Sequence, residues 1–110
     1  MEVKAREVVI SAIAIESLEK IFEYGTETFN YSSAVAFIEE LYNRIERLST
    51  EYLLHPECSY ITSTARLYRN IIHGNYLVIY RITNTRVEVL NVFHGSRKPS
   101  AIRSSKKIKI

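Results

Sequence analysis

The feature that most constrains this chain is a run of apolar residues with helical spacing between positions 34 and 52. Its members follow one another at steps of four, three, four, three and four residues, which places them on one face of an α-helix: Ala34, Ile38, Leu41, Ile45, Leu48 and Tyr52. The helix ends by His55-Pro56, because the residue before a proline is disfavoured in helical geometry. An amphipathic helix must bury its apolar face against another layer, so the rest of the chain has to supply that layer.

A strand and a first helix precede this segment. Residues 3–10 end in a β-branched cluster that is typical of a strand, and Ser11 stands where a helix N-cap is expected. Residues 12–25 then carry apolar side chains at helical spacing, and Gly25 marks a stop or a weak point. Because residues 30–33 offer a new cap, we expect two helices joined by a short loop.

Three strands are predicted in the second half of the chain. Residues 65–72, 76–83 and 87–94 are rich in β-branched and aromatic residues, and short segments with turn composition separate them. Alternation along the middle strand predicts one face made of four residues: Tyr76, Val78, Tyr80 and Ile82. The element order is therefore β-α-α-β-β-β. We predict an α+β fold with a small, mostly antiparallel sheet and a two-helix hairpin packed on one face.

Length and composition limit the organisation and the chemistry. The 110 residues suit one domain, which we place at residues 1–99, followed by a basic C-terminal tail at residues 100–110. No apolar run approaches the ~20 residues of a membrane span, the N-terminus lacks the pattern of a secretory signal, and the single Cys58 fits a reducing, cytoplasmic setting. No phosphate-binding loop, paired metal-ligand motif or nucleophile elbow is present, so we expect no metal, no cofactor and no membrane partner.

Charge is distributed unevenly along the chain. Residues 1–65 carry five basic and eleven acidic side chains, whereas residues 66–110 carry ten basic side chains and one acidic side chain, Glu88. Two interpretations stay open at this point. The two halves can pair in the fold, or they can form two faces that suit different partners.

The segment "RNIIHGNYLVIYRITNTRVEVLNVFHGSRKP" is similar to the toxins of the RelE/ParE superfamily of type II toxin–antitoxin modules. The matching points are Arg69, the Gly-Asn-Tyr turn at residues 74–76, the strand that ends in Tyr80-Arg81, and the closing "VLNVFHGSRKP". The stretch "VVISAIAIESLEKIFEYG" resembles the first strand, serine cap and first helix of that family. The resemblance runs from Val8 to Pro99.

This resemblance implies a small cytoplasmic toxin that a cognate antitoxin neutralises. Members of the superfamily differ in activity: RelE-like toxins cleave mRNA on the ribosome, and ParE-like toxins poison DNA gyrase. The long second helix and the "HGSR" ending resemble the ParE-like, plasmid-stabilisation branch more closely. The resemblance therefore implies growth inhibition through gyrase, with a ribosome-dependent mRNA endoribonuclease as the alternative.

The endoribonuclease alternative depends on three residues, and it leaves open whether the chain is an enzyme. Attack by a ribose hydroxyl needs proton transfer and cations at the phosphate, and histidine and arginine suit these roles. By resemblance, His94 would transfer the proton, and Arg69 and Arg81 would hold the phosphate. The chain departs from RNA-cleaving relatives, because residues 56–68 contain no lysine and no tyrosine follows Tyr80.

The remaining candidate residues concern partners. The basic C-terminal residues are candidates for contact with the target, with nucleic-acid phosphates or with an acidic antitoxin segment, unless the tail is a disordered terminus: Arg97, Lys98, Arg103, Lys106 and Lys107. Val35 and Tyr42 widen the apolar face of the second helix, which indicates a surface for an antitoxin helix. Arg69 and Arg81 are further candidates for antitoxin contact.

Overall fold

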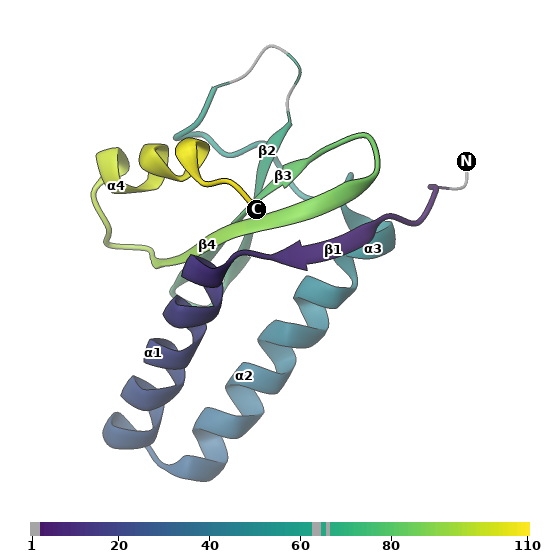
Figure 1. Cartoon of the computed structure of the whole chain (residues 1–110). Coiled ribbons are helices and arrows are strands. Elements are labelled where there is room, and N and C mark those ends of the chain that lie inside the picture. The colour runs from purple at the N-terminus through teal and green to yellow at the C-terminus, as the bar shows by residue number, and fades with distance from the viewer. Residues whose placement is uncertain (1–2, 63–64, 66) are drawn as a thin grey trace.

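A four-stranded sheet with a helical hairpin on one face forms the centre of the molecule (Figure 1). The computed structural model describes residues 3–62, 65 and 67–110. The elements follow in the order β1 (Glu7–Ile10), α1 (Ala12–Thr28), α2 (Tyr31–Glu46), α3 (Leu48–Glu51), β2 (Tyr68–His73), β3 (Tyr76–Ile82), β4 (Arg86–His94), α4 (Pro99–Arg103) and the 3-10 helix η1 (Ser104–Lys107). The strand order is β1-β4-β3-β2, and only the β1–β4 pair is parallel among these strands. The α+β class and the β-α-α-β-β-β order of the core are confirmed.

Ser11 joins the sheet to the first helix, as the sequence predicts. Its hydroxyl oxygen accepts a hydrogen bond from the Ala14 N–H at 2.9 Å, which caps α1. The same hydroxyl donates to the carbonyl oxygen of Leu90 at 2.6 Å. One buried side chain therefore fixes the start of α1 against β4.

Gly25 does not end the first helix, contrary to the sequence-based expectation. Helix α1 continues to Thr28, and the Phe29 N–H still donates to the Gly25 carbonyl at 2.9 Å. A β-carbon at position 25 would lie only 3.3 Å from the β-carbon of Ala34. The glycine thus allows α1 and α2 to approach each other closely in the hairpin.

The predicted second helix is divided into two elements but keeps its predicted buried face. Helix α2 ends at Glu46 and α3 begins at Leu48, with Arg47 in a turn between them. Most residues of the predicted apolar run are buried, with Ile38 half-buried: Ala34, Leu41, Ile45, Leu48 and Tyr52. All but Ala34 pack on the sheet face that carries Val78 and Tyr80, and Ala34 lies against Gly25 of α1.

The strands agree with the predicted positions except at their ends. Strand β1 covers only Glu7–Ile10 of the predicted residues 3–10, and β2 begins at Tyr68, whereas position 65 was expected. Gly74 has a φ of 58°, a backbone conformation that glycine adopts without strain, which fits the predicted tight turn. No helix among the described residues is long and apolar enough to span a membrane.

The opposite face of the sheet carries a second apolar cluster that the sequence did not indicate. Its buried members come from the loop before β2, from the three long strands and from α4: Cys58, Ile61, Tyr68, Ile79, Leu90, Phe93 and Ile102. Residues 99–110 lie across this face (Figure 1). The open question of order in the C-terminal tail is therefore answered, because α4 and η1 form part of the packed structure.

Candidate functional site

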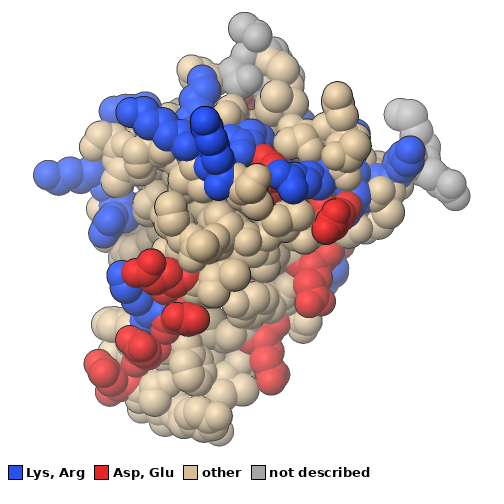
Figure 2. Space-filling model, in the orientation of Figure 1, with Lys and Arg blue, Asp and Glu red and all other residues tan. Residues whose placement is uncertain are grey.

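Residues 97–109 form a strongly basic surface of the molecule. Its six cationic side chains are all exposed, and we call them the basic C-terminal surface: Arg97, Lys98, Arg103, Lys106, Lys107 and Lys109. Figure 2 shows lysine and arginine gathered across the upper part of the molecule, whereas most acidic side chains lie lower, over the helical hairpin. No ion pair among the described residues joins residues 3–65 to residues 67–110. The described ion pairs lie within each half, which favours the interpretation with two differently charged faces.

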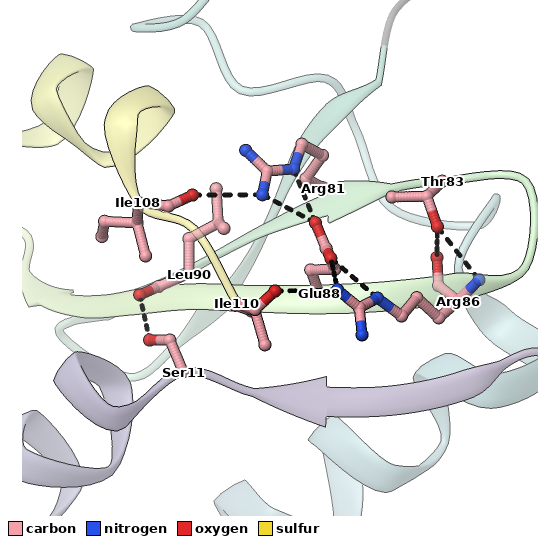
Figure 3. Close-up of polar contacts among 8 residues, drawn as sticks. All are labelled: Ser11, Arg81, Thr83, Arg86, Glu88, Leu90, Ile108 and Ile110. Carbon is pink, nitrogen blue, oxygen red and sulfur yellow. Dashed lines mark hydrogen bonds and ion pairs between the residues drawn. The ribbon is translucent and has the colours of Figure 1, made fainter.

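Buried contacts hold the basic C-terminal surface in place. Ile102 is completely buried in the apolar cluster on the sheet face that residues 99–110 cover, which we call the outer apolar cluster. Ser105, three residues further along the chain, is also buried. The Arg81 guanidinium donates to the carbonyl oxygen of Ile108, and the Arg86 guanidinium donates to the main-chain oxygen of Ile110, each at 3.1 Å (Figure 3). The cations of the surface are therefore presented from a fixed backbone.

Glu88 bonds to both of these arginines, Arg81 and Arg86. Its buried carboxylate accepts hydrogen bonds from Nε of Arg81 and from Nε of Arg86, both at 2.8 Å (Figure 3). Burial would raise the pKa of the Glu88 carboxyl, but the hydrogen bonds and charges of the two arginines outweigh it, so this pKa lies below its ordinary value.

The network around Glu88 also removes the one negative charge of the second half from the surface. Glu88 is the only acidic residue of residues 66–110, and two guanidinium groups enclose it. Sequence reasoning missed both Glu88 and Arg86 as functional residues. The available signal was a lone charged residue, Glu88, within the mostly apolar stretch "VEVLNVF".

His94 lies at the exposed end of β4, beside the turn between β2 and β3. Its Nδ1 is 2.7 Å from the Ser96 hydroxyl, and its ring meets the Tyr76 ring edge to face at 5.4 Å. It borders a shallow hollow of about 550 Å³ that Asn75 and Gly95 also line. The described contacts of this imidazole are therefore local.

The structure does not bring Arg69 close to His94. His94 is paired with Tyr76 across the sheet, whereas Arg69 is paired with Tyr80. Four residues along a strand correspond to about 13 Å. The Arg69 guanidinium instead donates to the carbonyl oxygens of Leu53 and His55, at 3.3 and 2.8 Å.

Arg81 is on the opposite face of the sheet from Arg69. It is paired with Tyr68 and Glu88 on the side that residues 99–110 cover, and it bonds to Glu88 and Ile108. His94, Arg69 and Arg81 therefore do not converge on one point. Both arginines bond within the chain through part of their donors, Arg69 through one terminal nitrogen and Arg81 through Nε and one terminal nitrogen. Their contact with an antitoxin stays a prediction.

The helical hairpin presents a separate, mostly apolar surface. Tyr42 is half-buried and lines a shallow groove of about 400 Å³ between α1 and α2, together with Leu18, Phe22 and Ile38. Val35, also half-buried, lies two turns before Tyr42 on the same side of α2. Glu19 and Glu23 form an acidic edge of the groove. We call this region the hairpin groove.

Metal coordination finds no support in the described part of the chain. No group of three or more His, Cys, Asp or Glu side chains is placed there to hold a metal ion. Cys58 is free and buried, and burial raises the pKa of its thiol above the ordinary value.

The sequence matches a known protein family, and the fold matches a solved structure. Residues 8–99 match the family described as the ParE toxin of type II toxin–antitoxin system, parDE. A solved chain from the chromosomal ParDE TA system of P. aeruginosa superposes with a TM-score of 0.69 and 10% sequence identity, covering 83% of this chain and 97% of that chain. No curated protein sequence matches the chain significantly. At 10% identity the solved chain supports the fold, and the family match covers most of the sequence.

Proposed function

Because the chain belongs to the ParE toxin family of type II toxin–antitoxin systems, we propose that it inhibits growth in the cytoplasm by poisoning DNA gyrase. A cognate antitoxin protein would neutralise it. The observation that carries the choice of target is the separation of His94 from Arg69 and Arg81.

Cleavage of RNA would need a different arrangement. In-line attack on a phosphodiester requires proton-transfer groups and cations around a single phosphate. About 13 Å along the strand separates His94 from Arg69, and the described bonds of both arginines stay within the chain. The ribosome-dependent mRNA endoribonuclease is therefore the second candidate, supported only by the presence of suitable residue types.

We assign the contact with the gyrase target to the basic C-terminal surface. A cationic patch speeds association with a negatively charged partner and fixes its orientation through charge complementarity. When the backbone that carries the cations is already ordered, binding costs less conformational entropy than it would for a disordered tail. Residues 99–110 have this property, since Ile102 and the Glu88 network hold their backbone.

We assign antitoxin binding to the hairpin groove. An amphipathic helix buries its apolar residues in a groove of this kind. Val35 and Tyr42 provide apolar and aromatic contact area, and the groove is remote in sequence from the basic C-terminal surface. The antitoxin could then be bound while its acidic segments reach the cationic face.

A supercoiling assay with purified components tests the gyrase assignment. Relaxed plasmid is incubated with gyrase, ATP and increasing toxin, and both supercoiling and cleaved DNA are measured. We expect supercoiling to fall and gyrase-linked cleaved DNA to accumulate. Full supercoiling at a large molar excess of toxin, together with mRNA cleavage in a translation extract, would instead favour the endoribonuclease.

A further inference from the structure

We propose that the basic C-terminal surface binds the phosphate backbone of duplex DNA directly. The inference rests on the proposed function, since it uses the surface assigned there to the target, and it names DNA as the chemical group that this surface contacts. The toxin would then recognise DNA and gyrase together.

The composition of the surface favours phosphate over protein. Four of its six cations are lysines, and lysine is depleted at the centres of protein–protein interfaces, which favour aromatic and apolar anchors. Most apolar side chains of this segment face inward, since Ile102 is fully buried and Ala101 and Ile108 pack on the outer apolar cluster. Apart from the exposed Pro99 and Ile110, the side chains that remain outside are cationic or hydroxylic, the residue types that contact phosphate and sugar.

Hydroxyl groups accompany the cations in one hollow of this surface. Ser96, Ser100 and Ser104 line a shallow depression of about 490 Å³ together with Arg97 and Lys98. Serine hydroxyls and arginine and lysine side chains are common donors to phosphate oxygens in nucleic-acid complexes. The Ser104 hydroxyl donates to the carbonyl oxygen of Ala101, and the Ser96 hydroxyl contacts His94 Nδ1, so Ser100 with Arg97 and Lys98 provides the donors over the start of α4.

The absence of aromatic residues favours a duplex over a single strand. Single-stranded nucleic acids are bound by stacking their bases on aromatic side chains, in addition to charge. Residues 96–110 contain no aromatic residue. A surface of cations and hydroxyls is suited to a backbone whose bases are already stacked.

Charge separation over the molecule gives the contact its orientation. The acidic residues of the first half lie mainly on the helices, as Figure 2 shows, so a polyanion is repelled from the hairpin and attracted to residues 97–109. Glu88, the one acid of the second half, is buried between Arg81 and Arg86. Anionic DNA therefore meets no exposed acidic side chain from residues 67–110 on its approach.

The test measures binding of the full chain, without gyrase, to a fluorescein-labelled 20-base-pair duplex at several salt concentrations. The variant Arg103→Gln/Lys107→Gln removes two exposed cations whose side chains make no hydrogen bond or ion pair within the described residues, and it leaves Ile102 and Glu88 in place. The matched control Lys20→Gln/Arg47→Gln also removes two charges, from exposed helical ion pairs. Circular dichroism checks that both variants fold.

We expect wild-type binding to weaken steeply with salt, because each phosphate contact contributes about 0.9 to the slope of log K against log salt. The Arg103/Lys107 variant should lose about 1.8 of that slope and at least about tenfold in affinity at 0.1 M salt. The control should bind as the wild type does.

Three results would overturn the inference. They are no duplex binding at 50 mM salt, equal loss in the control variant, and binding to single-stranded RNA or poly-glutamate in preference to the duplex. Different results would refute the DNA contact and the proposed gyrase target. A toxin that poisons gyrase but does not bind the free duplex removes only the DNA contact, whereas one that binds the duplex but leaves gyrase active removes only the gyrase assignment.

Discussion

The residue type of His94 suggests proton transfer, whereas its position in the structure does not place it with the arginines that such a reaction needs. The sequence places a histidine at a strand end among cations, which suits proton transfer at a phosphate. In the structure its Nδ1 lies beside the Ser96 hydroxyl, and Arg69 and Arg81 bond elsewhere. The strands themselves were predictable from composition. The register and the faces that separate these three residues were not, because they depend on pairing between distant segments.

Replacement of His94 by alanine tests the role of this residue. The side chain is exposed, so we expect the free energy of unfolding to change by less than about 0.5 kcal/mol. Under the proposed function, growth inhibition on induced expression should persist. Loss of toxicity in a folded His94→Ala protein that still binds its antitoxin would support the endoribonuclease instead.

Replacement of Glu88 by glutamine tests the buried network. The change leaves Arg81 and Arg86 without their carboxylate, and removing one partner of a buried pair is strongly destabilising. Because the Arg86 side chain is 34% exposed, we expect a loss of about 2 kcal/mol, below the range for fully buried pairs. Urea unfolding at neutral pH measures this loss.

The stability difference between the wild type and Glu88→Gln should depend on pH. The pKa of Glu88 is lower in the folded state than its ordinary value of 4.5, so its contribution is fully present above that pH and is lost as the pH falls through the folded-state value. The stability difference between wild type and Glu88→Gln should therefore shrink below about pH 4. A difference that stays constant from pH 7 to pH 3 would contradict the role assigned to the carboxylate.

At the scale of elements, the helical hairpin was predictable and the C-terminal segment was not. The second helix has six apolar positions at regular spacing, so its buried face follows from periodicity. Residues 99–110 have few apolar residues among many lysines and serines, too few to show a period. Their order comes from the burial of Ile102 and from Arg81 and Arg86, which are contacts with distant strands.

The hairpin groove is tested by Tyr42→Lys. The lysine replaces a half-buried aromatic ring with a charge, which should weaken antitoxin binding at least about tenfold while the toxin stays folded. Calorimetric titration with the cognate antitoxin measures the affinity, and Asn43→Lys on the exposed side of α2 is the matched control. Unchanged affinity for Tyr42→Lys would remove the groove from the antitoxin interface.

The docked C-terminal segment is tested by Ile102→Ala. Truncating a completely buried isoleucine costs about 2–4 kcal/mol, here mainly through release of α4 and η1 from the sheet. We expect trypsin to cleave after Arg103 and Lys106 faster than in the wild type. Ser100→Ala, at an exposed position of α4, should leave the cleavage rate unchanged. Equal rates in all three proteins would show that Ile102 does not hold the segment.

At the scale of the whole molecule, the sequence indicated the imbalance of charge but not its arrangement. Composition allowed the acidic and basic halves to pair or to separate, and the fold favours separation. The acidic helices and the basic C-terminal surface occupy different regions (Figure 2), and the described ion pairs stay within each half. This separation favours two partners, one at each region of the molecule.

The arrangement also shows why truncation is a poor test of the basic surface. Removing residues after Pro99 would delete the cations together with Ile102, and it would expose the outer apolar cluster. Loss of toxicity could then result from misfolding. The substitutions Arg103→Gln and Lys107→Gln remove charge alone.

The most direct test of the central claim is pulse-labelling after induced expression of the toxin in a bacterium. Incorporation of thymidine into DNA and of methionine into protein is followed separately over the first minutes. Poisoning of gyrase predicts that thymidine incorporation falls first, with methionine incorporation falling later. An early collapse of methionine incorporation while DNA synthesis continues would contradict the claim and indicate mRNA as the target.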